Sequence, residues 1–158
     1  MDTTFAYPPQ PFDDLELGRT YECGPRVVSR EDIADFGRLS GDLTALHTDE
    51  AYAAASPLGG LVAHGALNLA VATGLAYEMG IFEGLVLAFR GLTVRYERPV
   101  RPGDELTLRL TVAERDERPR PDRGRVGLDA ELVNQAGKRV LSGRWELLVR
   151  RSASAEEA

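Results

Sequence analysis

The segment from Gly65 to Met79 constrains the fold most strongly, because the helix that it predicts is apolar around nearly its whole circumference. The apolar positions are Ala66, Leu67, Leu69, Ala70, Val71, Ala72, Leu75, Ala76 and Met79. A helix that is hydrophobic on all sides belongs in a core, not on a surface. It is too short for a membrane span, which needs roughly 20 apolar residues. We therefore expect one long helix that is buried by the rest of the chain.

The C-terminal half predicts antiparallel strands. Apolar and polar residues alternate strictly over 106–112 and again over 125–132, which is typical of a sheet with one buried face. A third run places Leu141, Trp145, Leu147 and Val149 on one side. Residues 85–96 are apolar on both faces and predict a central, well-covered strand. The charged stretch from Glu114 to Gly124, with Pro119 and Pro121, predicts a solvated hairpin loop.

The N-terminal half predicts one strand around 20–28 and then helices. Ser29 followed by Asp32 resembles a capping box that opens a short helix through about Phe36. Residues 49–55 predict one or two further helical turns. Together with the C-terminal half, this pattern predicts an α+β fold in which about five antiparallel strands wrap around one long buried helix.

The length of 158 residues is that of one domain. We expect residues 1–13, with Pro8, Pro9 and Pro11, to run extended over the surface, and residues 14–150 to form the domain. Residues 151–158 are small and charged and predict a disordered tail.

Composition excludes several classes of partner. With 19 Lys and Arg against 25 Asp and Glu, the formal charge is −6, which argues against a general nucleic-acid binder. The sequence predicts no signal peptide and no membrane segment, so we expect a cytoplasmic protein. A single cysteine, Cys23, gives neither a disulfide nor a metal-ligand spacing, and we expect no metal.

The segment Leu39-Ser40-Gly41-Asp42-Leu43-Thr44-Ala45-Leu46-His47-Thr48-Asp49-Glu50 is the most unusual part of the sequence. It places a carboxylate, Asp42, and an imidazole, His47, on one loop, where a fold can direct two side chains at one point. An Asp and a neutral His that share one water can take up and return a proton, which accelerates a reaction by on the order of 10² to 10⁴. Taken alone, Asp42 is better explained as a turn residue and His47 as a structural histidine.

A second feature, Ala63-His64-Gly65, leads into the apolar helix. The start of a helix offers unpaired backbone N–H groups and a partial positive charge, and glycine lets a ligand approach the backbone closely. A thioester carbonyl placed at Gly65 would be polarised there. For His64 we favour a structural role in shaping the entry to the helix. Asn68 and Thr73, inside this helix, could contact a substrate, but core polar groups with internal partners explain them at least as well.

These segments resemble the R-specific enoyl-CoA hydratases, the MaoC-like dehydratases, whose motif usually reads Gly-Asp-x-Asn-Pro-x-His-x-Asp. The segment Tyr96-x-x-Pro99-Val100-x-x-Gly103-Asp104 is similar to the family pattern as well. The resemblance implies a hotdog fold and a trans-2-enoyl or 3-hydroxyacyl thioester of CoA or a carrier protein as substrate. It implies no cofactor and at least a homodimer. By motif position it makes Asp42 and His47 the catalytic pair and the Gly65 N–H the donor to the thioester oxygen.

The chain departs from the family motif at two positions: Thr44 stands where Asn is usual, and Ala45 where Pro is usual. Proline restricts its own backbone and that of its neighbour, so Ala45 predicts a less rigid loop. Thr44 can still form local hydrogen bonds, through a hydroxyl in place of an amide.

Two other functions remain open. An acyl-CoA thioesterase on the same fold often takes a carboxylate from the central helix, and here that helix carries no Asp or Glu before Glu78. A non-catalytic acyl-thioester binding subunit would retain the fold while its motif decays. Four arginines, at positions 90, 95, 98 and 101, could meet the phosphates of CoA, although a solvated edge explains each of them singly.

Overall fold

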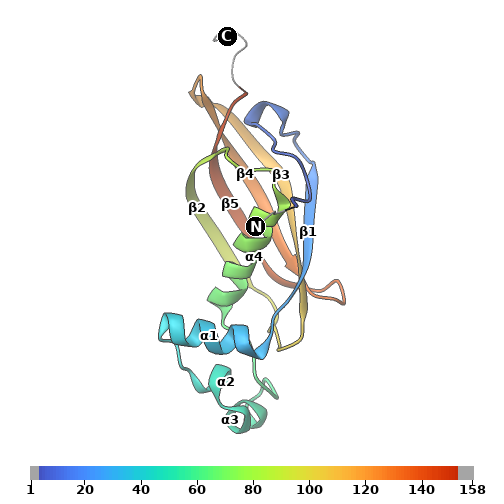
Figure 1. Cartoon of the computed structure of the whole chain (residues 1–158), viewed down its shortest axis with the longest axis vertical. Helices are drawn as coiled ribbons and strands as arrows, with labels where there is room; N and C mark the ends of the chain where they lie inside the picture. Colours follow the sequence, from blue (N-terminus) through green and yellow to red (C-terminus); the bar gives the residue numbers. More distant parts are fainter. Residues whose placement is uncertain (1–3, 153–158) are drawn as a thin grey trace.

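A computed structural model describes residues 4–152 (Figure 1). The helices are η1 (Phe12–Asp14), α1 (Arg30–Ser40), α2 (Ala45–Thr48), α3 (Glu50–Ala55) and α4 (Gly65–Met79). The strands are β1 (Thr20–Val27), β2 (Val86–Tyr96), β3 (Glu105–Arg120), β4 (Arg123–Val133) and β5 (Arg139–Arg150). No helix within the described residues has the length and apolar character to cross a membrane.

The five strands form one antiparallel sheet in the order β1-β3-β4-β5-β2, and this sheet wraps around α4 (Figure 1). This confirms the predicted α+β hotdog arrangement, and the long helix has the predicted bounds. The alternating apolar residues of β3 and β4 line the concave face and are buried. They are Leu106, Leu108, Leu110, Val112, Val126, Leu128, Ala130 and Leu132. One side of α4 packs against them through Leu67, Ala72, Leu75 and Met79.

The expectation that α4 is enclosed on all sides is wrong for the single chain. Ala66, Ala70, Thr73 and Tyr77 are exposed along one side of the helix. The reason is geometric, because one curved sheet can cover only the side of a helix that faces it. The described residues of one chain therefore leave part of the apolar surface of α4 exposed.

The prediction of a central strand over 85–96 is also wrong. The strand β2 lies at the edge of the sheet, and within residues 4–152 it pairs only with β5. Its apolar residues Val86, Phe89, Leu92 and Tyr96 are between 42% and 53% exposed. Apolar residues on both faces of a strand indicate that both faces become buried. They do not indicate whether the strand lies at the centre or at the edge of the sheet.

The predicted loop from Glu114 to Gly124 is instead the continuation of two strands. β3 runs through to Arg120, a tight turn occupies Pro121 and Asp122, and β4 begins at Arg123. The charges pair across the ladder, where Arg125 lies 3.2 Å from Asp116 and 3.5 Å from Glu114. Cross-strand pairs of opposite charge stabilise a sheet, so a charged sequence here is compatible with strand.

The predicted starts of α1 and α3 are confirmed to within one residue, whereas the sequence patterns do not predict the short helix α2, in which His47 lies. Ser29 and Asp32 form the predicted capping box, with the Ser29 side chain accepting from the Asp32 N–H and the Asp32 carboxylate accepting from the Ser29 N–H. The helix α1 extends beyond the predicted end to Ser40, and it stops where Gly41 adopts a left-handed conformation at φ 78°. Asp49 caps α3 by accepting from the Tyr52 N–H at 2.9 Å.

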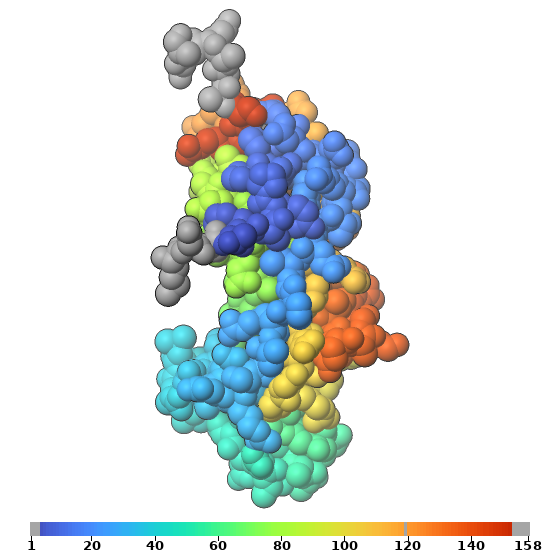
Figure 2. All heavy atoms as spheres, turned by 45° about the vertical axis from the view of Figure 1, so that its right-hand side comes forward, coloured from blue at the N-terminus to red at the C-terminus, as the bar shows by residue number. Residues whose placement is uncertain are grey.

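The N-terminal segment crosses the C-terminal end of α4 (Figure 2). The backbone N–H groups of Ala6 and Tyr7 donate to the carbonyls of Glu78 and Met79, at 3.1 and 2.9 Å. These are carbonyls at the end of the helix that have no partner within it. The segment therefore closes the end of α4 opposite to Gly65.

Phe12, in this same segment, is fully buried in the core. Its ring fills the space beside Gly124, where any Cβ would overlap it, and the guanidinium groups of Arg115 and Arg151 lie 4.7 and 4.9 Å from the ring centre. Arg151 also pairs with Asp13 at 2.7 Å. Of the tail predicted over 151–158, residues 153–158 lie outside the described residues.

The burial of Phe12 makes the N-terminal segment part of the folding unit. We expect Phe12→Ala to lower the free energy of unfolding by about 3–5 kcal/mol, because it removes a fully buried ring and leaves a cavity. Leu17→Ala, at a residue that is 64% exposed, should change it by less than about 0.5 kcal/mol. Urea unfolding measures both. Equal, small effects for the two variants would contradict this role of Phe12.

Candidate active site

The unusual loop lies beside the start of α4. The helices α1, α2 and α3 form a small layer beyond one end of the sheet, next to the N-terminal end of α4 (Figure 1). This layer brings Asp42 and His47 together with His64, and one nitrogen or oxygen atom from each lies within 4.8 Å of the others. Two motifs that are separated in sequence thus meet at one point of the structure.

Thr44 holds the Asp42 carboxylate. The Thr44 hydroxyl donates to Asp42 Oδ1 at 2.6 Å, and the Thr44 backbone N–H donates to the same oxygen at 3.2 Å. These two hydrogen bonds, the hydroxyl's first, hold the pKa of the Asp42 carboxyl below its usual range. Asp42 is thus an ionised acceptor, and Thr44 orients it from the position where the family motif has asparagine.

The hydrogen bonding of His47 fixes its tautomer. Its Nδ1 lies 2.7 Å from the backbone oxygen of Val62. A carbonyl oxygen can only accept, so Nδ1 carries the proton in this contact. The neutral ring therefore has its lone pair on Nε2, where it can accept a hydrogen bond or a proton.

His64 joins the loop to the helix. Its Nε2 donates to the backbone oxygen of Asp42 at 2.9 Å, and the residue is only 2% exposed. Its ring stacks on the His47 ring, with centres 3.8 Å apart and planes inclined by 30°. The structural role expected for His64 is thus present, together with a direct contact to Asp42 that sequence reasoning missed.

The same three residues are the group among the described residues that could hold a metal ion. The ring planes of His47 and His64 are inclined by 30°, and one nitrogen of each ring already contacts a backbone carbonyl. The nitrogens left for a ligand beside the Asp42 carboxylate are therefore Nε2 of His47 and Nδ1 of His64.

Gly65 is the first residue of α4, and its N–H is one of those that helix geometry leaves without an intrahelical partner. A Cβ at this position would lie 2.9 Å from Cζ of Tyr96, whose ring covers the glycine. Gly65 and Tyr96 line a pocket of about 360 Å³ together with Asn68. The predicted donor therefore opens onto a pocket.

A second, polar pocket of about 630 Å³ adjoins the first, because both are lined by Tyr96, Glu97 and Arg98. It also contains Arg95 and Arg139. Of the four arginines singled out in the sequence, Arg95 and Arg98 thus line one pocket, whereas Arg101 donates to the backbone oxygen of Leu58. Arg139 is already paired with Glu97 and Glu131, at 3.3 and 2.9 Å. Arg95 and Arg98 therefore leave a surplus of positive charge that favours an anionic group in this pocket.

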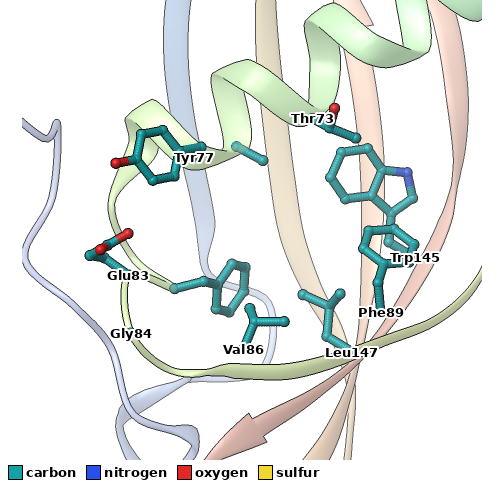
Figure 3. Close-up of a pocket in the computed structure, with 10 residues that line it drawn as sticks. Thr73, Tyr77, Glu83, Gly84, Val86, Phe89, Trp145 and Leu147 are labelled. Atoms are coloured by element: carbon teal, nitrogen blue, oxygen red, sulfur yellow. The ribbon is translucent and has the colours of Figure 1, made fainter.

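An apolar cavity of about 340 Å³ lies along the second half of α4 (Figure 3). Thr73 and Tyr77 from α4, Val86 and Phe89 from β2, and Trp145 and Leu147 from β5 surround it. Sequence reasoning missed this cavity, because each of these residues alone is typical of a core. The exposed apolar residues on the edge strand β2 were the available signal.

Known proteins are similar to this chain in sequence and in fold. A family model described as a MaoC like domain matches residues 14–134. The (R)-specific enoyl-CoA hydratase of Aeromonas caviae is 31% identical over 129 residues, which cover 82% of this chain and 91% of the relative. Protein MaoC of Klebsiella aerogenes is 35% identical over 101 residues, or 63% of this chain, but the match spans only 30% of that longer protein.

Among solved structures, R-hydratase PhaJ1 from Pseudomonas aeruginosa in the unliganded form superposes with a TM-score of 0.77 at 31% identity. That similarity covers 91% of this chain and 88% of the other.

The role of Thr44 can be tested at the carboxylate itself. We expect Thr44→Val to raise the pKa of Asp42 towards its ordinary value, because the hydroxyl that stabilises the ionised form is gone. Carboxyl carbon chemical shifts measured against pH report this pKa. Thr48→Val removes a hydroxyl that donates to the Leu43 and Thr44 carbonyls, and it serves as the control.

The Thr44→Val substitution should also alter how the free energy of unfolding depends on pH. Because the folded-state pKa of Asp42 is lowered, its contribution is present above the unfolded pKa and is lost as the pH falls through the folded pKa. Thr44→Val should therefore weaken the pH dependence of unfolding in that acidic range. An unchanged Asp42 pKa in Thr44→Val would contradict the assignment.

Proposed function

The chain belongs to the MaoC-like domain family, and from this premise we propose that it reversibly hydrates a trans-2-enoyl thioester to the (R)-3-hydroxyacyl thioester. The observation that carries the proposal is the proximity of two acceptors: the Asp42 carboxylate lies within 4.8 Å of an imidazole nitrogen of His47, whose Nε2 keeps its lone pair. The relatives named as hydratases and dehydratases support the reaction class.

Two acceptors hold one water in a reactive orientation. A water that donates one hydrogen to Asp42 and the other to His47 turns a lone pair of its oxygen outward, towards C3 of the substrate. As the C3–O bond forms, the π bond between C2 and C3 breaks and one O–H bond of the water is lost. The proton passes through the pair and C2 gains a proton, so atoms and charge balance.

The start of α4 would stabilise the charge that develops on the thioester oxygen. During addition to C3, electron density moves through C2 into the carbonyl. The Gly65 N–H and the positive end of the helix dipole are placed to bind that oxygen. A single donor of this kind is typically worth about 3 kcal/mol in the transition state. His64 positions Asp42 for this step through the Asp42 carbonyl.

The remaining pockets fit the two ends of such a substrate. The polar pocket with Arg95, Arg98 and Arg139 would take the phosphates of a CoA or carrier thioester. The apolar cavity begins at Thr73, about 12 Å along the helix axis from Gly65, and would take the far end of an acyl chain (Figure 3).

A thioesterase on this fold is less well supported. The acidic residue on α4 that could drive hydrolysis is Glu78, which lies about 20 Å along the helix axis from Gly65. Glu78 lines a different groove, with Arg26. A decayed, non-catalytic subunit is also disfavoured, because Thr44 preserves the geometry of the carboxylate.

We propose further that the working unit is a homodimer. Edge strand β2 presents unpaired backbone groups and exposed apolar side chains at Val86, Phe89 and Leu92. An exposed edge of this kind is a template for pairing with another strand. A second copy that pairs at β2 would cover this edge and the open side of α4 together.

The catalytic proposal is tested by the loss of enoyl-thioester absorbance when the protein is mixed with trans-2-enoyl-CoA substrates from four to ten carbons. We expect rapid loss with an (R)-3-hydroxyacyl product, identified by chiral chromatography. Asp42→Asn and His47→Ala should each lower kcat at least about 10²-fold, because each removes one of the two groups that handle the proton. Asp35→Asn, at an exposed residue of α1 outside the motif, serves as the control. Release of free thiol without hydration would show a thioesterase instead.

The dimer is tested by light scattering on the purified protein. We expect twice the mass of the chain, and we expect Leu92→Lys to shift the population towards monomer, because it places a charge on the edge strand. Leu17→Lys, at an exposed residue away from β2, should leave the mass unchanged. A wild-type protein that remains monomeric at micromolar concentration would contradict the proposed dimer.

A further inference from the structure

Asn68 is a polar residue buried without a full set of partners. It lies in the first turns of α4, is 3% exposed, and its Oδ1 has no hydrogen-bond partner among the described residues. The side chains around it on this helix are apolar. An unsatisfied buried carbonyl oxygen costs folding free energy, so its presence calls for an explanation.

The position of Asn68 relates it to the proposed thioester site. It follows Gly65 by three residues, so the two lie on the same face of the helix, about one turn apart. Both line the pocket of about 360 Å³ that Tyr96 closes on one side. That pocket leads through Glu97 and Arg98 into the arginine pocket. An acceptor without a partner therefore lies between the thioester oxygen site and the anion site.

The chemistry of the substrate supplies one group for this acceptor. In CoA and in carrier proteins alike, the thioester sulfur is followed by two carbons and then by an amide N–H. With the thioester oxygen at the Gly65 N–H, this amide falls near the next turn of the helix, because one helical turn rises about 5.4 Å. In the 3-hydroxyacyl form the hydroxyl at C3 is a second donor close to the thioester, and the proposed function assigns it to Asp42 and His47.

We propose that Asn68 Oδ1 accepts a hydrogen bond from the first amide N–H of the pantetheine arm and thereby sets the thioester against Gly65. The inference rests on the proposed function for the identity of the substrate. Asn68 would thus be a binding residue that lies outside both the family motif and the segment 39–50. This role also explains why an apolar helix retains an asparagine at a buried position, because the residue is satisfied only in the complex.

If Asn68 serves binding, Asn68→Leu should affect the stability of the protein in the opposite direction from that expected if Asn68 serves the fold. If Asn68 served only the fold, Asn68→Leu would destabilise the protein. If its oxygen is kept for a ligand, leucine removes an unsatisfied buried group, and the melting temperature should stay the same or rise. Asn68→Ala removes the acceptor without adding volume, and it covers the case in which leucine does not fit.

The experiment measures binding of saturated butanoyl thioesters, which have no double bond to hydrate, to the full-length protein by calorimetry. One ligand is S-butanoyl-pantetheine; the other replaces its first amide with an ester, which keeps the shape and removes the N–H. We expect Asn68→Leu and Asn68→Ala to weaken the amide ligand about tenfold and to leave the ester ligand unchanged. Glu78→Gln, at the far end of α4, is the matched control.

Two further titrations identify whether CoA or an acyl-carrier protein supplies the pantetheine group that binds. Butanoyl-CoA and a butanoyl-loaded acyl-carrier protein are titrated separately, and the one whose affinity depends on Asn68 is the source. Equal weakening of the amide and ester ligands, or no weakening of either, overturns the inference. Because binding needs no turnover, this result is independent of whether wild-type protein hydrates enoyl thioesters.

Discussion

A hydrogen bond from His64 to Asp42 helps to join the two halves of the site. His64 Nε2 donates to the backbone oxygen of Asp42, and this bond ties the loop after α1 to the residue that precedes α4. The His47 ring rests on the His64 ring, while Nδ1 of His47 is anchored to Val62. The position of the carboxylate and the direction of the imidazole lone pair therefore both depend on how the chain enters the long helix.

The helix itself imposes the layout of the binding surfaces. Its N-terminal end provides backbone donors and positive potential, so the polar chemistry gathers there. Its second half is apolar and borders the cavity with Trp145 and Phe89. Its C-terminal carbonyls are closed by the backbone of Ala6 and Tyr7. Under the proposed function, this single helix would order the polar end and the apolar end of a thioester along one axis, while the sheet leaves one side of the helix open.

Local patterns in the sequence were enough to predict the elements whose cause is local. The capping box at Ser29 and the bounds of the helix 65–79 follow from neighbouring residues. Asp42 lies on the expected loop, whereas His47 lies in the short helix α2. The place of β2 at the sheet edge, the continuation of β3 through a charged stretch and the burial of Phe12 depend on partners distant in sequence. The contact of His64 with Asp42 and the missing partner of Asn68 are likewise tertiary, and no periodicity reports them.

The central claim is that Asp42 and His47 act as one unit around one water, and a double-mutant cycle on hydration of a short trans-2-enoyl-CoA tests it most directly. Groups that work on the same proton are not additive, so removing the second adds little once the first is gone. The account predicts that the kcat/KM of the double variant Asp42→Asn/His47→Ala lies close to that of the slower single variant. Losses that multiply in the double variant would show two independent groups and would contradict the shared water.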